Sequence, residues 1–304
     1  MTPPLRFAAV DVTYSSGVRA VRGVDLVVEA GQCVAVIGES GCGKTTLARA
    51  ALGLLPGGAA VTGSIQVGGV EVAGARPAVL RRLRGRRIGL VTQDPFASCD
   101  PLRTVGHHVA EAWTAHRMRP PPGAVVAALD RLGIPRAEAR SREHPHQWSG
   151  GMLQRATIAA ASAHEPPVLI ADEPTSALDA DRAHAILAAL RATHAGLLLI
   201  SHDLSVVAGH ADQVAVMYAG RIVEYGPASR VLAAPLHPYT AALRAAEPRP
   251  GHGLPEGLAG GPPRLDQPDA GCAFAPRCPL ADARCRRELP LLLSGVACHH
   301  AVPA

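Results

Sequence analysis

Short apolar runs alternate with stretches of helical periodicity along this 304-residue chain. Two runs, 168–171 and 197–200, contain only aliphatic residues, which is typical of parallel strands that are buried on both faces. Residues 33–37 and 88–92 are further short runs rich in strand-forming residues. Helical patterns begin at about residue 47 and again near 182, so strands and helices alternate. The alternation predicts an α/β core.

Two other stretches depart from this alternation. Residues 104–165 are mostly helical in pattern, with a break at the Pro- and Gly-containing segment 120–123. From about residue 248 to 263, Pro and Gly become frequent, which predicts an irregular linker. We therefore expect a helical insertion within the core and a short, cysteine-bearing tail after it.

Composition limits the class of protein. The chain is 48% hydrophobic but only 3% aromatic, which predicts a core of Ala, Val and Leu. The net charge of +5 is mild and the arginines are spread along the chain, so nucleic-acid binding is not favoured. No apolar run reaches the roughly 18 residues of a spanning helix, and the N-terminus lacks a signal-peptide pattern. We expect a soluble, cytoplasmic protein whose cysteines are reduced, buried or metal-bound.

The only lysine of the chain, Lys44, lies in the glycine-rich segment 38–46. A predicted strand precedes this segment and a predicted helix follows it, which is the context of a phosphate loop. Such a loop directs backbone N–H groups at phosphate oxygens, and Gly41 and Gly43 let its backbone approach them. We expect Lys44 to reach the β- and γ-phosphates and Thr45 to offer its hydroxyl to Mg²⁺.

An acidic pair, Asp172-Glu173, follows the buried run 168–171. A carboxylate at the end of a buried strand is costly unless it meets a cation, so Asp172 is suited to hold Mg²⁺ through water. Glu173 is suited to polarise an attacking water. An acidic pair alone commonly caps a helix, and the phosphate loop is what favours the functional interpretation. Similarly, Ser149 with its two following glycines opens a helix and could be an ordinary cap.

Together these segments resemble the ATP-binding subunits of ABC transporters. The family's motifs occur in its order over about residues 8–235. They comprise an adenine-stacking aromatic (Tyr14), Walker A (Gly38, Ser40, Gly41, Cys42, Gly43, Lys44, Thr45, Thr46), the Q-loop (Gln93), the signature (Ser149, Gly150, Gly151), Walker B with the following glutamate (Asp172, Glu173), the D-loop (176–179, with Asp179) and the switch histidine (His202). One departure is Trp148, where the family usually has Leu.

The resemblance implies a role for each motif. Two subunits pair head to tail, so that Ser149 would serve the ATP bound to the partner subunit. Gln93 would sense Mg²⁺ and the attacking water, and would couple to the membrane subunit. His202 would hold the γ-phosphate and the water-activating Glu173. Thr45, Gln93 and Asp172 would together hold Mg²⁺.

The end of the chain resembles one subfamily, the dipeptide, oligopeptide and nickel importer ATPases. Residues 236–243 are similar to the start of that subfamily's C-terminal extension, and the tail carries a similar cysteine motif. The motif consists of Cys272, Cys278, Cys285 and Cys298. Its spacing contains no Cys-x-x-Cys pair, unlike common zinc modules. The resemblance implies a [4Fe–4S] cluster; zinc, favoured by the adjacent histidines 299 and 300, and uncoordinated thiols remain alternatives.

The fold implied by the resemblance is α/β. It is a RecA-like P-loop ATPase core with an antiparallel β subdomain and a helical subdomain inserted at about 94–160, spanning residues 1–235. An irregular, cysteine-rich extension would follow over 236–304. The implied function is ATP hydrolysis that drives import of peptides, nickel or related solutes from the cytoplasmic face of the membrane. The implied partners are two integral-membrane permeases, a paralogous or identical ATPase and an external solute-binding protein, and no nucleic acid.

Two other functions compete with this interpretation. A soluble ABC-type ATPase could act on nucleic acid, but such proteins usually carry tandem nucleotide domains or long coiled-coil insertions. This chain has one Walker A segment and no sustained heptads. An ATP-responsive redox-sensing module is the second alternative, with the cysteine-rich tail as the sensor.

Overall fold

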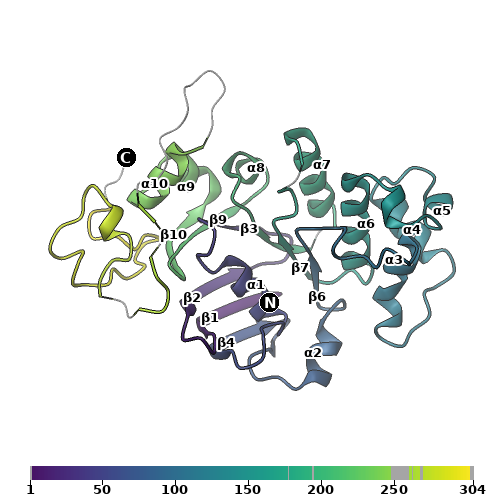
Figure 1. Ribbon diagram of the computed structural model, residues 1–304, viewed down its shortest axis with the longest axis horizontal. Coiled ribbons are helices and arrows are strands. Elements are labelled where there is room, and N and C mark those ends of the chain that lie inside the picture. The colour runs from purple at the N-terminus through teal and green to yellow at the C-terminus, as the bar shows by residue number, and fades with distance from the viewer. Residues whose placement is uncertain are drawn as a thin grey trace. The chain divides into compact units, whose positions relative to one another are not determined.

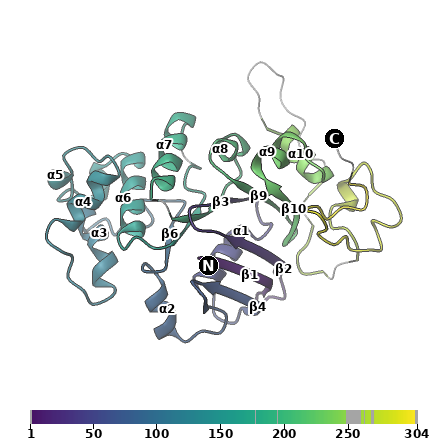
Figure 2. The same ribbon diagram turned by 180° about the vertical axis from the view of Figure 1, so that it is seen from behind.

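The structure is a computed structural model that describes residues 2–176, 178–193, 195–247, 260–261, 263–267 and 270–301. These residues form two compact units, each assembled from separated segments (Figures 1 and 2). The first unit consists of Met1–Leu5, Val28–Cys33 and Gln66–Ile200. The second unit consists of Arg6–Val27, Val34–Ile65 and Ser201–Ala304.

Three parallel strands form the core of the first unit. They are β6 (Ile88–Val91), β7 (Val168–Asp172) and β8 (Gly196–Ile200), with β7 in the middle. Nearly every residue of β7 and β8 is buried, because a central parallel strand has no face toward water. The buried parallel strands predicted at 168–171 and 197–200 are thus confirmed, and the strand predicted at 88–92 is confirmed to within one residue.

The helices of the first unit gather around α6 (Gly150–Ser162), which contacts α3 (Val105–Thr114), α4 (Ala124–Arg131), α7 (Ala180–Arg191) and β6. The unit also contains β5 (Val70–Glu71), α2 (Pro77–Leu83), α5 (Ala137–Arg140) and η1 (Pro145–Gln147). Helix α3 begins at the Thr104 cap, whose hydroxyl accepts a bond from the His107 amide. The helical segment predicted at 104–165 is confirmed.

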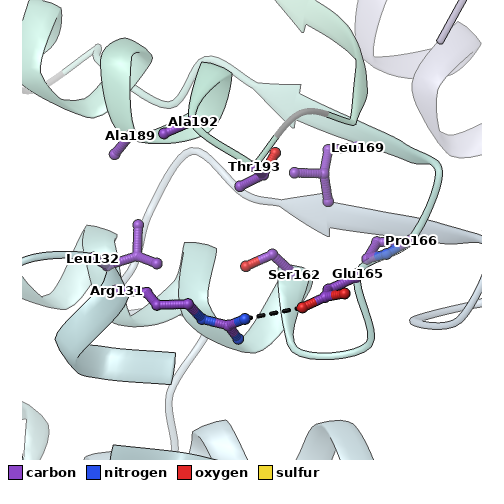
Figure 3. Close-up of a pocket in the computed structure, with 9 residues that line it drawn as sticks. All are labelled: Arg131, Leu132, Ser162, Glu165, Pro166, Leu169, Ala189, Ala192 and Thr193. Carbon is purple, nitrogen blue, oxygen red and sulfur yellow. Dashed lines mark hydrogen bonds and ion pairs between the residues drawn. The ribbon is translucent and has the colours of Figure 1, made fainter. Parts of the chain in front are cut away.

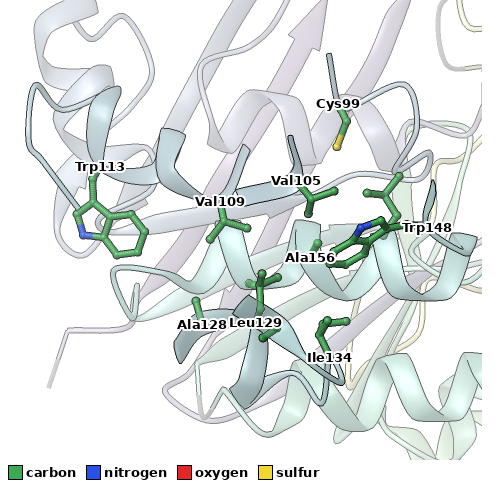
Figure 4. Packing of buried hydrophobic residues seen from close by; sticks show 12 residues of the cluster. Cys99, Val105, Val109, Trp113, Ala128, Leu129, Ile134, Trp148 and Ala156 are labelled. Atoms are coloured by element: carbon green, nitrogen blue, oxygen red, sulfur yellow. The ribbon is translucent and has the colours of Figure 1, made fainter. Parts of the chain in front are cut away.

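An apolar cluster holds these helices together (Figure 4). Val105, Val109 and Trp113 lie four residues apart on α3, so they share one face of that helix. They pack with Leu129 of α4 and with Trp148, which is 4% exposed just before α6. Burial of each large side chain contributes about 2 kcal/mol. Trp148 is therefore a packing residue, as expected at the position where the family has Leu.

The second unit contains two groups of strands. In one, β1 (Leu5–Thr13) lies between β2 (Arg19–Val28) and β4 (Ala60–Val67), whose last residues pair with β5. In the other, β9 (Gln213–Tyr218) runs parallel to β3 (Cys33–Ile37) and antiparallel to β10 (Arg221–Pro227). The helices of this unit are α1 (Lys44–Ala51), α8 (Leu204–Ala208), α9 (Ala228–Ala233) and α10 (Pro238–Ala245). The predicted strand at 33–37 and the helix after the glycine-rich loop are confirmed.

Residues 236–304, here called the C-terminal extension, include α10, and their other described residues form mainly turns and one short helix, η2 (Ala275–Arg277). Phe274 is nearly fully buried there, at 2% exposed. Most of the linker predicted at 248–263 lies outside the described residues. Across the described segments, no helix is both long and apolar enough to cross a membrane.

Candidate nucleotide site

The phosphate loop, residues 38–46, follows strand β3 and includes the first three residues of helix α1. Two of its glycines are required by space as well as by backbone conformation. Gly38 has a φ of 151°, and a Cβ there would lie 2.1 Å from the Met217 carbonyl oxygen. Gly43 has a φ of 110°, and its Cβ would lie 2.1 Å from the Ala20 carbonyl oxygen. Only glycine fits either position, so β9 and β2 fix the curvature of the loop.

Lys44 lies back over this loop. Its ammonium nitrogen donates to the carbonyl oxygens of Gly38, at 2.7 Å, and Glu39, at 3.0 Å. The residue is only 7% exposed. An ammonium has three donors, and the third faces the Cys42 sulfur at 3.8 Å, so these contacts orient the charge within the loop. Burial raises the pKa of the neighbouring Cys42 thiol, which favours a packing role over a reactive one.

The predicted adenine-stacking residue lies beside the same loop. The Tyr14 hydroxyl is 2.9 Å from the Thr46 hydroxyl oxygen on the first turn of α1. The Tyr14 amide also donates to the Val18 carbonyl, which closes the turn between β1 and β2. The second unit therefore brings together Tyr14, Thr46 and Lys44.

His202 follows Ser201 and precedes helix α8. The neighbouring Asp203 caps this helix, because its carboxylate accepts a bond from the Val206 amide at 3.1 Å. The Asp203 amide donates to the Ser201 hydroxyl at 3.1 Å. The serine and aspartate thus shape the turn, and His202 is exposed on it. The adjacent Ser-His-Asp sequence is a helix-capping turn and not a hydrolase triad, as expected from the sequence.

In the first unit, the acidic pair lies at the end of β7. Asp172 is the last residue of the strand and pairs with Ile200 of β8. Glu173 has a φ of 51°, a left-handed conformation that costs a non-glycine residue about 1 kcal/mol or more. Its amide donates to the Ile200 carbonyl at 3.0 Å, and this bond fixes the turn. Backbone strain of this kind is concentrated at functional sites.

The signature segment begins helix α6. Ser149 is its cap, with a hydroxyl that accepts a bond from the Met152 amide at 3.3 Å, and Gly150 and Gly151 form the first turn. The buried Gln154 on the same helix donates to the Thr92 carbonyl at 3.2 Å. Thr92 directly precedes the exposed Gln93. A hydrogen bond within the first unit therefore links helix α6 to the residue before Gln93, the predicted Q-loop glutamine, and the sequence carries no signal for this bond.

The predicted D-loop ends at the cap of α7. The Asp179 carboxylate accepts a bond from the Arg182 amide at 3.0 Å and lies 3.3 Å from the Arg182 guanidinium. Asp179 is exposed on the surface of the first unit. Of the D-loop residues, Ala177 lies outside the described part of the chain.

The four cysteines of the tail line one small cavity, here called the cysteine cavity. Its walls also include His237, His299 and His300. Burial, followed by the proximity of the other thiols, raises the pKa of Cys272 and Cys298. All four cysteines are free thiols. The four cysteines span 27 positions of the sequence, and they lie together at one place in the second unit.

A second donor set overlaps the cysteine cavity. One ligand atom from each of Asp282, Cys285 and His300 lies within 4.8 Å of the other two. The His300 ring nitrogen is 3.0 Å from the Asp282 carboxylate. A mixed S, N, O set of this kind suits zinc better than an iron–sulfur cluster, which prefers four thiolates. The thiols of the cavity suit a cluster, and the overlapping set of Asp282, Cys285 and His300 suits zinc.

A hollow of the first unit lies apart from these residues (Figure 3). It has a volume of about 440 Å³ and is lined by residues of α4, α6, α7 and β7, among them Ser162, Leu169 and Ala189. An exposed ion pair between Arg131 and Glu165, at 3.0 Å, crosses its edge. None of the predicted site residues lines this hollow, so we do not assign the nucleotide to it.

Comparisons with known proteins agree with the motifs. The ABC transporter family model matches residues 21–176, and the model of the oligopeptide/dipeptide transporter C-terminal region matches residues 223–285. The oligopeptide transport ATP-binding protein OppD of Mycobacterium tuberculosis is 42% identical over 99% of this chain and 52% of its own length. The chain thus spans about half of that relative. A putative peptide import ATP-binding protein of Brucella ovis is 41% identical over 95% of this chain and 91% of its own length.

Solved structures show the same fold. The cbiO1 protein of Clostridium perfringens, part of an ABC transporter complex, superposes with a TM-score of 0.65 and 28% identity over 77% of this chain and 92% of its own. A dimeric ATP-binding cassette bound to ADP and Pi gives a TM-score of 0.64 at 24% identity, over 74% of this chain and 98% of its own. The chain therefore has the ABC ATPase fold, with mixed α/β sheets and helices. It belongs to the ABC transporter family, with the C-terminal region of its oligopeptide/dipeptide transporters, and the resemblance seen in its motifs is confirmed.

Proposed function

We propose that this chain is the ATP-hydrolysing subunit of an ABC importer for peptides, nickel or related small solutes. The observation that carries the proposal is the phosphate loop. The chain's only lysine lies over this loop, and Gly38 and Gly43 leave no room there for a side chain. Peptides are the favoured solute, because the Brucella ovis relative is a putative peptide import protein and a 41% identical Bacillus subtilis relative is a dipeptide transport protein.

In the proposed reaction, water attacks the γ-phosphate in line, with no covalent intermediate. Glu173 polarises this water, and His202 contacts the γ-phosphate and holds Glu173. Lys44 contacts the β- and γ-phosphates, with the backbone N–H groups of Gly38, Ser40, Gly41, Cys42, Gly43, Thr45 and Thr46 around them. Thr45, Gln93 and Asp172 supply oxygen ligands that suit Mg²⁺, which would neutralise charge on the phosphates.

The remaining motif residues act on adenine or across a dimer. Tyr14, held beside α1, stacks on the base. Ser149, Gly150 and Gly151 contact the ATP of the partner subunit, and Asp179 lies in the same interface. This role is supported by the exposure of Ser149 at the start of a 13-residue helix, where free N–H groups and the helix dipole favour an anion.

We place the division between the nucleotide-binding domain and its extension at about residue 235. The domain of residues 1–235 would be a RecA-like core with an antiparallel β subdomain and a helical subdomain at about 94–160. Residues 236–304 would form the cysteine-rich extension. The partners would be two permeases, a second ATPase that is similar or identical, and an external solute-binding protein, with the chain bound peripherally at the cytoplasmic face of the membrane. Nucleic acid would have no part.

For the cysteine cavity we propose a [4Fe–4S] cluster held by Cys272, Cys278, Cys285 and Cys298. Support comes from the fit of the residues: four free thiols from an irregular loop line one cavity. Burial raises the pKa values of Cys272, Cys285 and Cys298, so ligand binding would have to displace protons from these thiols. When bound, the cluster would cross-link a segment that has little regular structure of its own.

The ATPase proposal is tested by Glu173→Gln in the purified chain. We expect hydrolysis to fall by at least about 100-fold while MgATP binding persists, because the amide cannot polarise water. The matched control is Glu165→Gln, since Glu165 is also a glutamate with positive φ (50°) but is exposed beside the hollow of Figure 3. Equal activity of wild type and Glu173→Gln would contradict the proposed role.

The cluster proposal is tested on protein purified without oxygen. A visible absorption band from bound cluster and about four irons per chain are the expected result. Replacing Cys278 with Ser should remove both signals, whereas replacing the buried Cys33 outside the extension should remove neither. A colourless protein that contains zinc and no iron would overturn the cluster in favour of the overlapping Asp282, Cys285 and His300 set.

A further inference from the structure

An ion pair connects the phosphate loop to the C-terminal extension. The guanidinium of Arg277 donates to both carboxylate oxygens of Glu39, at 2.8 and 2.9 Å. Glu39 is the second residue of the loop, and Arg277 directly precedes Cys278 of the cysteine cavity. The Arg277 side chain is 6% exposed and that of Glu39 is 24% exposed. This two-bond geometry is the strongest that a guanidinium and a carboxylate can form.

Aromatic residues fix the Arg277 side chain in place. Its guanidinium carbon lies 5.9 Å from the ring centroids of both Tyr218 and Phe274. It also donates to the Tyr218 hydroxyl at 3.3 Å. A planar cation held against two rings and paired with a carboxylate has little freedom to leave. The hydrogen bonds to Glu39 accordingly raise the pKa of Arg277.

The backbone of Glu39 is held by the extension as well. Its amide donates to the hydroxyl of Tyr239 at 2.8 Å. Tyr239 is fully buried on α10, and its ring lies 4.5 Å from that of Tyr218. The carbonyl of Glu39 accepts a bond from Lys44 at 3.0 Å. One loop residue thus connects the phosphate-binding lysine to two residues of the extension.

Glu39 also brings a negative charge into a loop whose ligand is an anion. With Arg277 in place, the carboxylate is neutralised, and the loop presents Lys44 and backbone N–H groups to the phosphates. Without Arg277, an uncompensated and largely buried carboxylate would repel the phosphates and lose its preferred position. The pair therefore has a consequence for ligand affinity beyond its contribution to stability.

We propose that Arg277 and Tyr239 are positioning residues of the nucleotide site, through which the C-terminal extension holds Glu39 and sets the affinity of the phosphate loop. Neither contacts the nucleotide; both act through Glu39. The proposal rests on the proposed binding of MgATP at this loop. The extension would in this way be part of the ATP site of its own subunit.

The test is the Kd of the full-length chain for Mg²⁺ and a non-hydrolysable ATP analogue, measured by calorimetry. Arg277→Gln should weaken binding by about tenfold, and Glu39→Gln should change the Kd by much less. The double variant should recover most of the loss, because the repelling charge is then absent. A residue with a purely structural role would not show this rescue. Arg264→Gln is the matched control, since Arg264 forms a similar two-bond pair with Asp266 at an exposed place.

Failure of nucleotide binding and failure of the positioning role give different results. A wild-type chain that fails to bind the analogue overturns nucleotide binding itself. A wild type that binds and an Arg277→Gln variant that binds equally well overturn only the positioning role, as does a double variant that is weaker than either single one. If Arg277→Gln does not fold, Arg277→Lys keeps the charge and loses the paired geometry. A loss of about threefold is expected there, and unchanged affinity would contradict the proposal.

Discussion

The phosphate loop and the cysteine cavity both gather ligand-binding groups from irregular backbone, but they are built differently. The loop uses contiguous residues between a strand and a helix, so regular structure on both sides determines its shape. The cavity uses four cysteines spread from 272 to 298, in a segment with only one short helix. A contiguous motif can be interpreted from its sequence because its geometry is local. The sequence of a dispersed motif shows which ligand groups are present, but not which residues lie beside them in the structure.

The largest expected effect concerns Lys44, on which the loop depends most. Lys44→Ala removes the only ammonium that lies over the loop carbonyls, so kcat/KM for ATP should fall by at least about 100-fold. Arg49→Ala, exposed on the same helix α1, should stay within about twofold of wild type. Steady-state ATPase assays measure both. If Lys44→Ala retained its ATPase activity, residues 38–46 would be no different in function from any other glycine-rich turn.

A second prediction separates crowding of the loop from its backbone conformation. Gly43→Ala places a Cβ against the Ala20 carbonyl in a left-handed backbone, so the free energy of unfolding should fall by about 3 kcal/mol. Gly31→Ala shares the positive φ but meets nothing within 4 Å, and should cost about 1 kcal/mol. Urea unfolding of both variants gives the comparison. Equal losses would show that neighbouring strands do not shape the loop.

In the extension, the next prediction concerns how the stability contributed by His237 depends on pH. Burial lowers the pKa of His237 to about 4, and its ring nitrogen accepts a bond from the Tyr239 amide. The unfolded chain, with a histidine pKa near 6.5, then binds more protons than the folded chain between pH 4 and 6.5. The stability contributed by neutral His237 is thus complete above about pH 6.5 and declines as the pH falls, by about 2 kcal/mol at pH 5.

His237→Asn isolates this contribution, since asparagine retains an acceptor at the start of α10 and does not titrate. The difference in unfolding free energy between wild type and this variant should shrink as the pH falls from 7 to 5. A difference that is constant over that range would show that His237 is not held neutral in the extension. Unfolding in urea at several pH values measures it.

The contrast between local and dispersed features also explains which elements the sequence predicts. Strands β3, β6, β7 and β8 and helix α1 were predicted because buried runs and the glycine-rich loop are local signals. Strand β9 was not assigned, although it is an apolar run, because nothing in the sequence marks its parallel partner β3. The motifs containing Tyr239 and Arg277 were both noted, but not their contact with Glu39. Those pairs are 200 and 238 residues apart, and no periodicity links them.

The site residues divide in the same way. For Asp172, Glu173 and Ser149 the sequence predicted the positions, at a strand end and a helix start, where the structure places them. The hydrogen bond from Gln154 to Thr92 had no sequence signal, since a buried glutamine on a helix has many possible acceptors. The competing set at Asp282, Cys285 and His300 was also missed in that form. The sequence indicates histidines 299 and 300 as zinc ligands, whereas nothing in it marks Asp282.

Binding of the MgATP phosphates by Lys44 can be tested directly, because the chain has no other lysine. An amine-directed acylating reagent can modify only Lys44 and the N-terminal amine, and mass spectrometry distinguishes the two. MgATP should slow the modification of Lys44 and leave that of the N-terminal amine unchanged. Equal labelling of Lys44 with and without MgATP would contradict it.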